Sequence, residues 1–260
     1  MGGSSSPELN GPRAGFGIDI GGSGMKAAVV DLDTGALLSD RRRIPTPRPA
    51  TPPAMAGVLC ELLGHLGWDD ALGAAFPAIV QHGVVKLAAN IDASWIGVDA
   101  RRLFTEASGH EVALLNDADA AGIAEMRFGA GRGRGGVVVM LTFGTGIGSG
   151  LFVDGVLVPN TELGHLELDG REAESRASAA ARERERLGWA EWAPRVERYL
   201  QHLEMLFSPD LFIIGGGASK NASAWLPDIG VDTEIVPAQM ANNAGIVGAA
   251  LVGSGAVPIG

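Results

Sequence analysis

The sequence lacks the features of several protein classes. It has one cysteine, Cys60, which excludes an intramolecular disulfide and a zinc site built from cysteines. We interpret Cys60 as a core residue, because it lies in an apolar periodic run. No stretch reaches the roughly 20 apolar residues that span a bilayer, and no signal-peptide pattern opens the chain. We therefore expect a cytoplasmic protein without a membrane partner.

Positive charge is also scarce: the chain has 20 basic and 30 acidic residues, and its formal net charge is −10. This balance argues against nucleic acid as a partner, and a polyanionic ligand would need a local basic patch. The 46 % of hydrophobic residues excludes global disorder, and 260 residues suffice for two modest domains. Many of the 39 glycines follow apolar runs, which indicates backbone that approaches a ligand closely.

One order of elements occurs twice along the chain. Residues 1–14 are rich in Gly, Ser and Pro and predict a flexible tail. A strand at 15–20, a glycine turn at 21–24 and a strand at 25–32 follow. A second strand, glycine turn and strand are predicted at 137–143, 144–150 and 151–154. This internal repeat predicts two related α/β lobes with a cleft between them.

The other predicted elements separate and follow these two units. We expect further strands at 36–44, 72–77, 83–88, 112–116, 156–158 and 211–214. Helices are predicted at 54–66, 99–108, 117–128 and 245–252, and residues 171–208 are expected to be helical throughout.

The first glycine turn is a candidate phosphate site, because glycines let backbone N–H groups converge on an anion. Its residues are Asp19, Gly21, Gly22, Ser23, Gly24 and Lys26. Asp19 is placed to hold Mg²⁺ or its water, and Lys26 to offset phosphate charge. The spacing is not that of a Walker A loop, and a tight hairpin with incidental charge is the alternative.

Two later glycine clusters have similar chemistry. Thr142, Gly144, Thr145 and Gly146 suit a second phosphate cradle, although the pattern does not match the dinucleotide fingerprint. Gly215, Gly216 and Gly217 follow an apolar strand and suit a nucleoside or phosphate contact. A glycine-rich hairpin and a close-packed turn are the respective alternatives.

Polar side chains in two further segments are candidates for catalysis and sugar binding. Asp117 and Asp119 follow an apolar strand, where either could accept a proton from an alcohol or cap the next helix. Glu162 and His165 have the groups that grip adjacent sugar hydroxyls, although single exposed residues of these types often have no such role.

Seven ordered motifs between residues 15 and 252 resemble the ROK family of sugar kinases. They are GIDIGGSGMK, AANIDASWIG, LLNDADAAGIAE, LTFGTGIGSG, ELGHLE, REAESRAS and LFSPDLFIIGGGASK. Within the family, the likeness is to bacterial polyphosphate glucokinases and polyphosphate/ATP glucomannokinases. The resemblance implies an α/β, actin-like ATPase (ribonuclease H-like) fold with two lobes and a central cleft. Residues 15–115 plus 242–255 would form the small lobe, and 116–241 the large one.

The resemblance also implies roles for individual residues. Asp117 would be the catalytic base, and Gly215 to Gly217 would lie near the adenosine of a nucleotide. Hexose contacts would come from Asn90, Asn116, Asp117, Glu162, His165 and Glu174. Many family members carry zinc-binding cysteines after this histidine. None follows here, so we expect no structural zinc and a His165 free to bind sugar.

The implied reaction moves a phosphoryl group from inorganic polyphosphate, ATP or both to the 6-hydroxyl of glucose, with Mg²⁺ and with mannose as a further acceptor. Arg132 and Arg134 are a candidate polyphosphate patch, with solvated surface charge as the alternative. An ATP-only kinase for another hexose or an N-acetylated amino sugar is the second interpretation. A nucleotide-gated actin-like protein is a third, and monomer and homodimer stay open.

A sugar-responsive repressor is disfavoured. Such a protein needs a DNA-binding segment ahead of the kinase-like region. Only about 14 residues precede the first predicted strand, and the chain is acidic.

Overall fold

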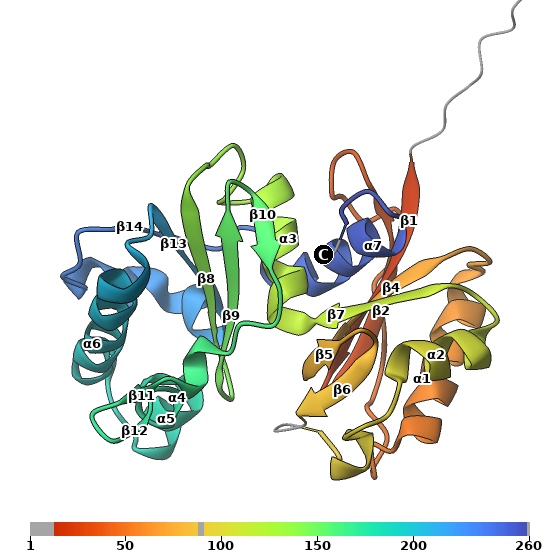
Figure 1. Cartoon of the computed structure of the whole chain (residues 1–260), viewed down its shortest axis with the longest axis horizontal. Helices are drawn as coiled ribbons and strands as arrows, with labels where there is room; N and C mark the ends of the chain where they lie inside the picture. The colour runs from red at the N-terminus through yellow and green to blue at the C-terminus, as the bar shows by residue number, and fades with distance from the viewer. Residues whose placement is uncertain (1–12, 88–90, 259–260) are drawn as a thin grey trace, which may run out of the picture.

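The computed structural model describes residues 13–87 and 91–258, which form two five-stranded sheets (Figure 1). In the first sheet, the hairpin of β1 (Ala14–Gly21) and β2 (Gly24–Asp31) is extended by the antiparallel edge strand β3 (Arg42–Ile44). On the other side of β1, β4 (Leu72–Phe76) and then β7 (Val112–Asn116) run parallel to it.

The second sheet repeats this order and these directions. The hairpin of β8 (Val137–Phe143) and β9 (Ile147–Val153) is extended by antiparallel β10 (Val156–Val158). Beyond β8, β13 (Leu211–Gly216) and β14 (Glu234–Pro237) run parallel to it. The repeat predicted from the glycine turns is therefore confirmed, and the fold is the two-lobed actin-like α/β fold.

Helices cover both faces of each sheet. The outer face of the first sheet packs against α1 (Pro52–Leu66) and α2 (Ala100–Ser108), and that of the second against α6 (Trp189–Phe207). Between the sheets lie α3 (Asp117–Phe128) and α7 (Ala244–Gly253) (Figure 1). Residues from both sheets and both helices share one apolar core there, so the sheets are joined through α3 and α7.

Glycines let α7 approach its neighbours at backbone distance. A Cβ at Gly73 of β4 would lie 1.8 Å from the Ala249 carbonyl oxygen, and one at Gly17 of β1 would lie 1.9 Å from that of Ile246. From α7 itself, a Cβ at Gly248 would lie 1.8 Å from the Ala120 carbonyl oxygen of α3. No side chain fits at these contacts, so the spacing of the two halves depends on glycine.

The remaining elements are short. They are β5 (Ile79–Gln81), β6 (Val84–Leu87), β11 (Glu167–Leu168), β12 (Arg171–Glu172), α4 (Glu174–Ala177), α5 (Ala179–Arg184) and several 3₁₀ turns. Among the described residues, no helix is both long and apolar enough to cross a membrane.

Three predictions about secondary structure were wrong, and the edge strand β14 was missed. Most of the expected strand at 36–44 is irregular, and only its last three residues form β3. The expected turn at 144–150 is shorter, since β9 already begins at Ile147. Residues 171–208 are not continuously helical, because β12, α4 and α5 precede α6. The sequence also gave no indication of β14, a short edge strand that ends in Pro237.

Candidate active site

Two adjoining cavities open between the halves of the molecule. The cleft cavity, of about 330 Å³, is lined by Gly21, Gly22, Pro77, Ala78, Ile79, Leu87, Asn116, Asp117, Thr142, Gly144 to Ser149, Glu162, His165 and Glu174. The loop cavity, of about 280 Å³, is lined mainly by Asp19, Lys26, Asp117, Glu125, Thr142, Gly215 to Gly217, Ser219, Lys220, Asn242 and Gly245. Asp117 and Thr142 border both cavities, so a group held near them is reached from either side.

Asp117 is placed by the junction of β7 and α3. The preceding residue, Asn116, is the N-cap: its Oδ1 accepts from the backbone N–H groups of Ala118 at 2.8 Å and Asp119 at 3.2 Å. The Asn116 amide donates to the Ala78 carbonyl at 3.3 Å, which ties the helix start to the first half. Asp117 Oδ1 also accepts from the Ala118 N–H at 2.9 Å, and the side chain borders the cleft cavity.

The pKa of Asp117 is raised to about 7. Burial between the two halves is the largest cause, and the charges of Asp19 and Glu162 add to it. The Asp117 carboxylate is not completely enclosed, because solvent still reaches it from the cleft. The walls of the cleft and the neighbouring charges therefore raise its pKa. A carboxylate with a pKa near neutrality is suited to accepting a proton at physiological pH.

Asp119, the alternative base, has a different setting. Its side chain is buried, and Oδ2 accepts from the Asn160 backbone N–H at 2.8 Å. Asp119 lines neither the cleft cavity nor the loop cavity. It lines a third cavity, together with Val80 and Asn160. Burial also raises the pKa of Asp119 to about 7.

These two carboxylates give a prediction about pH. If ionised Asp117 is the base, kcat/KM falls as the pH drops through about 7, because the raised pKa leaves the group protonated there. Initial rates between pH 5 and 9 measure this acidic limb of the pH profile, in which kcat/KM falls with decreasing pH. The Asp119→Asn variant is the control and should retain the limb. A limb that vanishes in this variant would assign it to Asp119.

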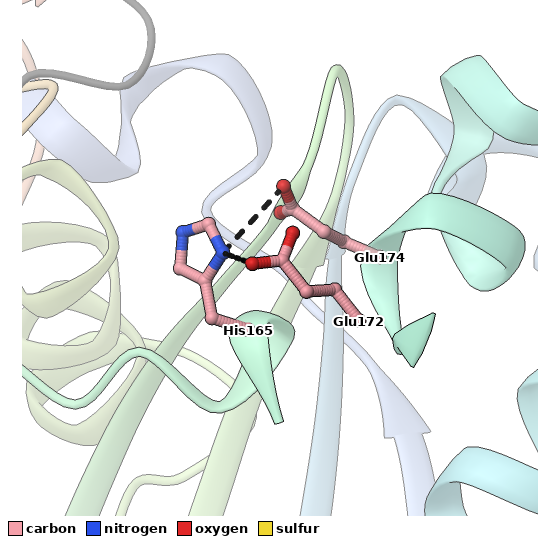
Figure 2. Close-up of side chains that lie close together, drawn as sticks. All are labelled: His165, Glu172 and Glu174. Carbon is pink, nitrogen blue, oxygen red and sulfur yellow. Dashed lines mark ion pairs between the residues drawn. The ribbon is translucent and has the colours of Figure 1, made fainter. Parts of the chain in front are cut away.

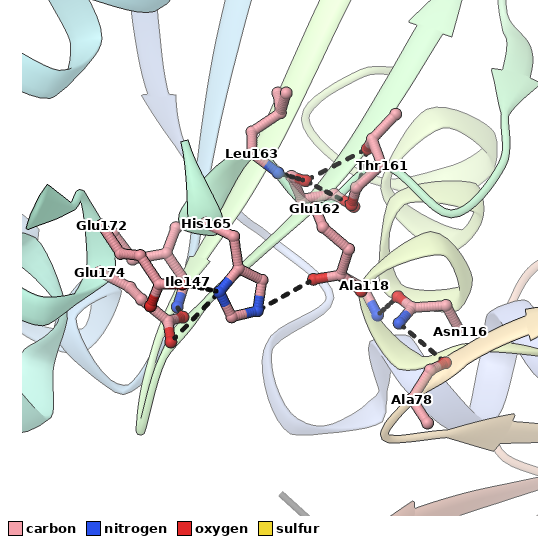
Figure 3. Close-up of polar contacts among 11 residues, drawn as sticks. Ala78, Asn116, Ala118, Ile147, Thr161, Glu162, Leu163, His165, Glu172 and Glu174 are labelled. Carbon is pink, nitrogen blue, oxygen red and sulfur yellow. Dashed lines mark hydrogen bonds and ion pairs between the residues drawn. The ribbon is translucent and has the colours of Figure 1, made fainter. Parts of the chain in front are cut away.

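Three carboxylates surround His165 (Figures 2 and 3), and of these Glu162 and Glu174 line the cleft cavity together with the histidine. Its Nε2 lies 4.0 Å from Glu162, and its Nδ1 lies 3.4 Å from Glu172 and 3.9 Å from Glu174. Burial raises the pKa of Glu162, which the Glu174 charge raises further and the nearby His165 lowers. The ring thus lies between carboxylates on both of its nitrogens, at ion-pair distances.

His165, Glu172 and Glu174 also have metal-capable atoms within 4.8 Å of one another (Figure 2). In the part of the chain that the structure describes, this is the one group of three or more such residues. Glu172 is exposed, and no cysteine follows His165, so the group lacks the thiolates of a structural zinc site.

Glu174 links this wall to the second glycine turn. Its Oε2 accepts from the Ile147 backbone N–H at 3.0 Å, where β9 begins. A Cβ at Gly146 would lie 2.3 Å from the same oxygen, so only glycine leaves room for this contact. Gly144, Thr145 and Gly146 all line the cleft cavity.

The first hairpin turn lies on the opposite side of the cleft. Gly21 and Gly22 line the cleft cavity, whereas Asp19 and Lys26 line the loop cavity and form an ion pair at 3.0 Å. The Ser23 carbonyl accepts from Arg43, and a Cβ at Gly24 would lie 2.6 Å from the same side chain.

The remaining predicted site residues are distributed differently. Gly215, Gly216 and Gly217 line the loop cavity, and Asn90 lies outside the described residues. Arg134 forms an ion pair with Glu234, at the start of β14. Glu234 is paired with the start of β13, whereas Gly216 lies at the other end of β13. Arg132, two residues earlier, lies in the same loop and does not line either cavity.

Sequence reasoning did not find Lys220, Asn242 or Glu172. Lys220 lies three residues after the triple glycine, so its position was a usable signal. Asn242 and Glu172 reach the site only through tertiary packing, which local spacing does not encode.

The chain belongs to the ROK family, whose family model matches residues 15–184. It is 51 % identical to the polyphosphate glucokinase of Mycobacterium tuberculosis (strain CDC 1551 / Oshkosh), over 95 % of this chain and 94 % of that protein. The glucokinase of Streptomyces coelicolor is 28 % identical, over 90 % of this chain and 96 % of its own length.

Solved structures agree with this assignment. The inorganic polyphosphate/ATP-glucomannokinase from Arthrobacter sp. strain KM matches with a TM-score of 0.87 and 51 % identity, covering 92 % of this chain and 97 % of that one. A ROK family glucokinase from Streptomyces griseus, in complex with glucose and AMPPNP, matches with a TM-score of 0.80 and 26 % identity, covering 94 % and 100 %.

Proposed function

We propose that this chain is a hexokinase that transfers a phosphoryl group from inorganic polyphosphate or ATP to the 6-hydroxyl of glucose, with mannose as a further acceptor. One observation carries the proposal: Asp117 borders both the cleft cavity and the loop cavity. A hydroxyl in the first and a phosphoryl donor in the second would meet at this carboxylate. The similarity to polyphosphate glucokinases and to a polyphosphate/ATP-glucomannokinase supports these substrates.

The cleft cavity is the proposed hexose site. Its volume of about 330 Å³ is of the size that small ligands occupy. Glu162, His165 and Glu174 present carboxylate and imidazole atoms that can bind neighbouring hydroxyls, and Asn116 lines the same cavity. We propose that Asn90 completes this set. Asp117 then accepts the proton of the 6-hydroxyl as the oxygen attacks phosphorus in line.

The loop cavity and the glycine turns are the proposed donor site. Backbone N–H groups at Gly21 to Gly24 and at Gly144 to Gly146 would contact phosphate oxygens, and Gly215 to Gly217 would lie beside an adenosine. Lys26 and Lys220 line this cavity and would offset phosphate charge. Asp19 and Asp117 both border it, and carboxylate oxygens are the ligands that Mg²⁺ prefers. Asp19 would hold the ion or a water bound to it, and the ion would neutralise charge on the phosphoryl group.

We also propose that residues 15–115 with 242–255 form one lobe and 116–241 the other. The packing of α7 on β1 and β4 supports the assignment of the last helix to the first lobe. The substrates of sugar phosphorylation favour the cytoplasm, as does the single cysteine.

A coupled assay of sugar phosphate formation tests the proposal. Glucose, mannose and an N-acetylated hexosamine are each combined with nucleotide-free polyphosphate or with ATP, in the presence of Mg²⁺. We expect turnover of glucose with both donors. Turnover with ATP alone would refute the polyphosphate donor, and turnover of the hexosamine alone would refute the acceptor.

A further inference from the structure

One rim of the loop cavity is an edge strand that carries arginines. β3 pairs with β2 so that Arg43 lies opposite Lys26 and Ile44 lies opposite Met25. Residues directly opposite in a sheet point to the same face, and successive residues point to opposite faces. Because Met25 and Ile44 pack in the core on the α1 side, Lys26 and Arg43 face the other side, where the loop cavity lies.

Arg41 lies two residues before Arg43 and reaches the same rim. Its Nη1 donates to the Asn242 carbonyl at 3.3 Å and to Asn243 Oδ1 at 3.2 Å, and Asn242 lines the loop cavity. Arg43 Nη2 donates to the Ser23 carbonyl at 2.6 Å, in the first glycine turn. Both arginines are exposed, so each is anchored by one part of its guanidinium and presents the rest to solvent.

Arg41 and Arg43 differ from Arg134 in their ionic partners. Among the described residues, the ion pairs involve neither Arg41 nor Arg43, whereas Arg134 is paired with Glu234. Two of the three lysines of this acidic chain, Lys26 and Lys220, line the adjoining cavity. Uncompensated guanidinium groups beside a phosphate site match phosphate oxygens in charge and in hydrogen-bond geometry.

We propose that Arg41 and Arg43 continue the row that begins at Lys26 and form a track for the part of the polyphosphate chain beyond the transferred phosphate. Strands about 4.8 Å apart and residues about 3.4 Å apart along a strand give this row a length of roughly 10 Å. The track rests on the proposed function. A nucleotide would not need it, because the Gly215 to Gly217 side of the cavity is free for adenosine.

The alternation of the strand supplies a matched control. Arg42 lies opposite Ala27 and points to the α1 face of the sheet. It therefore has the same charge as Arg41 and Arg43 but faces away from the loop cavity. The double variant Arg41→Gln/Arg43→Gln is compared with Arg42→Gln and with Arg132→Gln/Arg134→Gln. Initial rates are measured at saturating glucose with long-chain polyphosphate, tripolyphosphate and ATP at several salt concentrations. Thermal midpoints show that each variant is folded.

For Arg41→Gln/Arg43→Gln we expect the KM for long-chain polyphosphate to rise about tenfold or more, because two charge-assisted contacts are lost. Its dependence on salt should become shallower. The KM values for ATP and tripolyphosphate should stay near those of the unmodified protein, and Arg42→Gln should behave like that protein with all donors.

Three results would overturn the track. They are an equal loss with polyphosphate and ATP, the same selective loss in Arg42→Gln, and a selective loss confined to Arg132→Gln/Arg134→Gln. Turnover of the unmodified protein is measured first, because its absence with polyphosphate but not with ATP would refute the proposed donor itself.

Discussion

The Asp117→Asn variant should lose about 10²- to 10⁴-fold in kcat with either donor, which is the usual contribution of a positioned general base. Asparagine has nearly the same shape but cannot accept the proton of the hexose hydroxyl. The loss should be clearest at pH 8, where the raised pKa of about 7 leaves Asp117 largely ionised in the unmodified protein. Initial rates with glucose and ATP measure the effect.

Binding separates this role from a structural one. The helix cap is made by Asn116, so α3 should still begin at the same residue in the variant. Calorimetric titration with glucose should still give measurable binding, since Glu162, His165 and Glu174 are retained. Near-normal turnover in Asp117→Asn would eliminate Asp117 as the base and return Asp119 to consideration.

The Gly73→Val variant should be destabilised by about 3 kcal/mol or more, at the upper end of the usual cost of overpacking. A Cβ at this position would lie 1.8 Å from the Ala249 carbonyl oxygen and 2.4 Å from its carbon. Both atoms are backbone, so no side-chain rotation relieves the contact and α7 must move away from β4. Urea denaturation followed by circular dichroism measures the change in the free energy of unfolding.

Gly57→Ala is the matched control for this variant. Gly57 is exposed on α1, and a Cβ there meets nothing within 4 Å. Alanine should therefore raise the stability by up to about 1 kcal/mol through its helix propensity. If Gly73→Val unfolds at the same urea concentration as the unmodified protein, α7 does not pack on β4 at backbone distance.

The first hairpin and the internal repeat could be predicted because their signals are local. Apolar strands bracket a glycine turn in both halves, a pattern that predicts a hairpin from neighbouring residues alone. The Asn116-Asp117 junction was equally readable as a strand end followed by a helix start. Sequence alone could not say which polar residue caps the helix and which faces the cleft. The structure separates them, because Asn116 bonds the N–H groups of both Ala118 and Asp119, whereas Asp117 borders both cavities.

The errors have tertiary causes. Alternating glycines in 144–150 looked like an extended turn, but Gly148 and Gly150 are strand residues over which α3 passes closely. A Cβ at Gly148 would lie 2.9 Å from the Ala118 side chain. Strand glycines of this kind mark a close approach that local propensity cannot reveal. The contact of Glu172 with His165 and the approach of Arg41 to Asn242 likewise join segments that are distant in the sequence.

The most direct test follows the phosphoryl group itself. The unmodified protein is incubated with glucose, Mg²⁺ and nucleotide-free long-chain polyphosphate, and ³¹P NMR is recorded over time. We predict a growing phosphomonoester signal at the 6-position of glucose as polyphosphate is consumed, and no such signal without the sugar. Release of inorganic phosphate alone, or no sugar phosphate even after ATP is added, would contradict the assignment of this cleft to hexose phosphorylation.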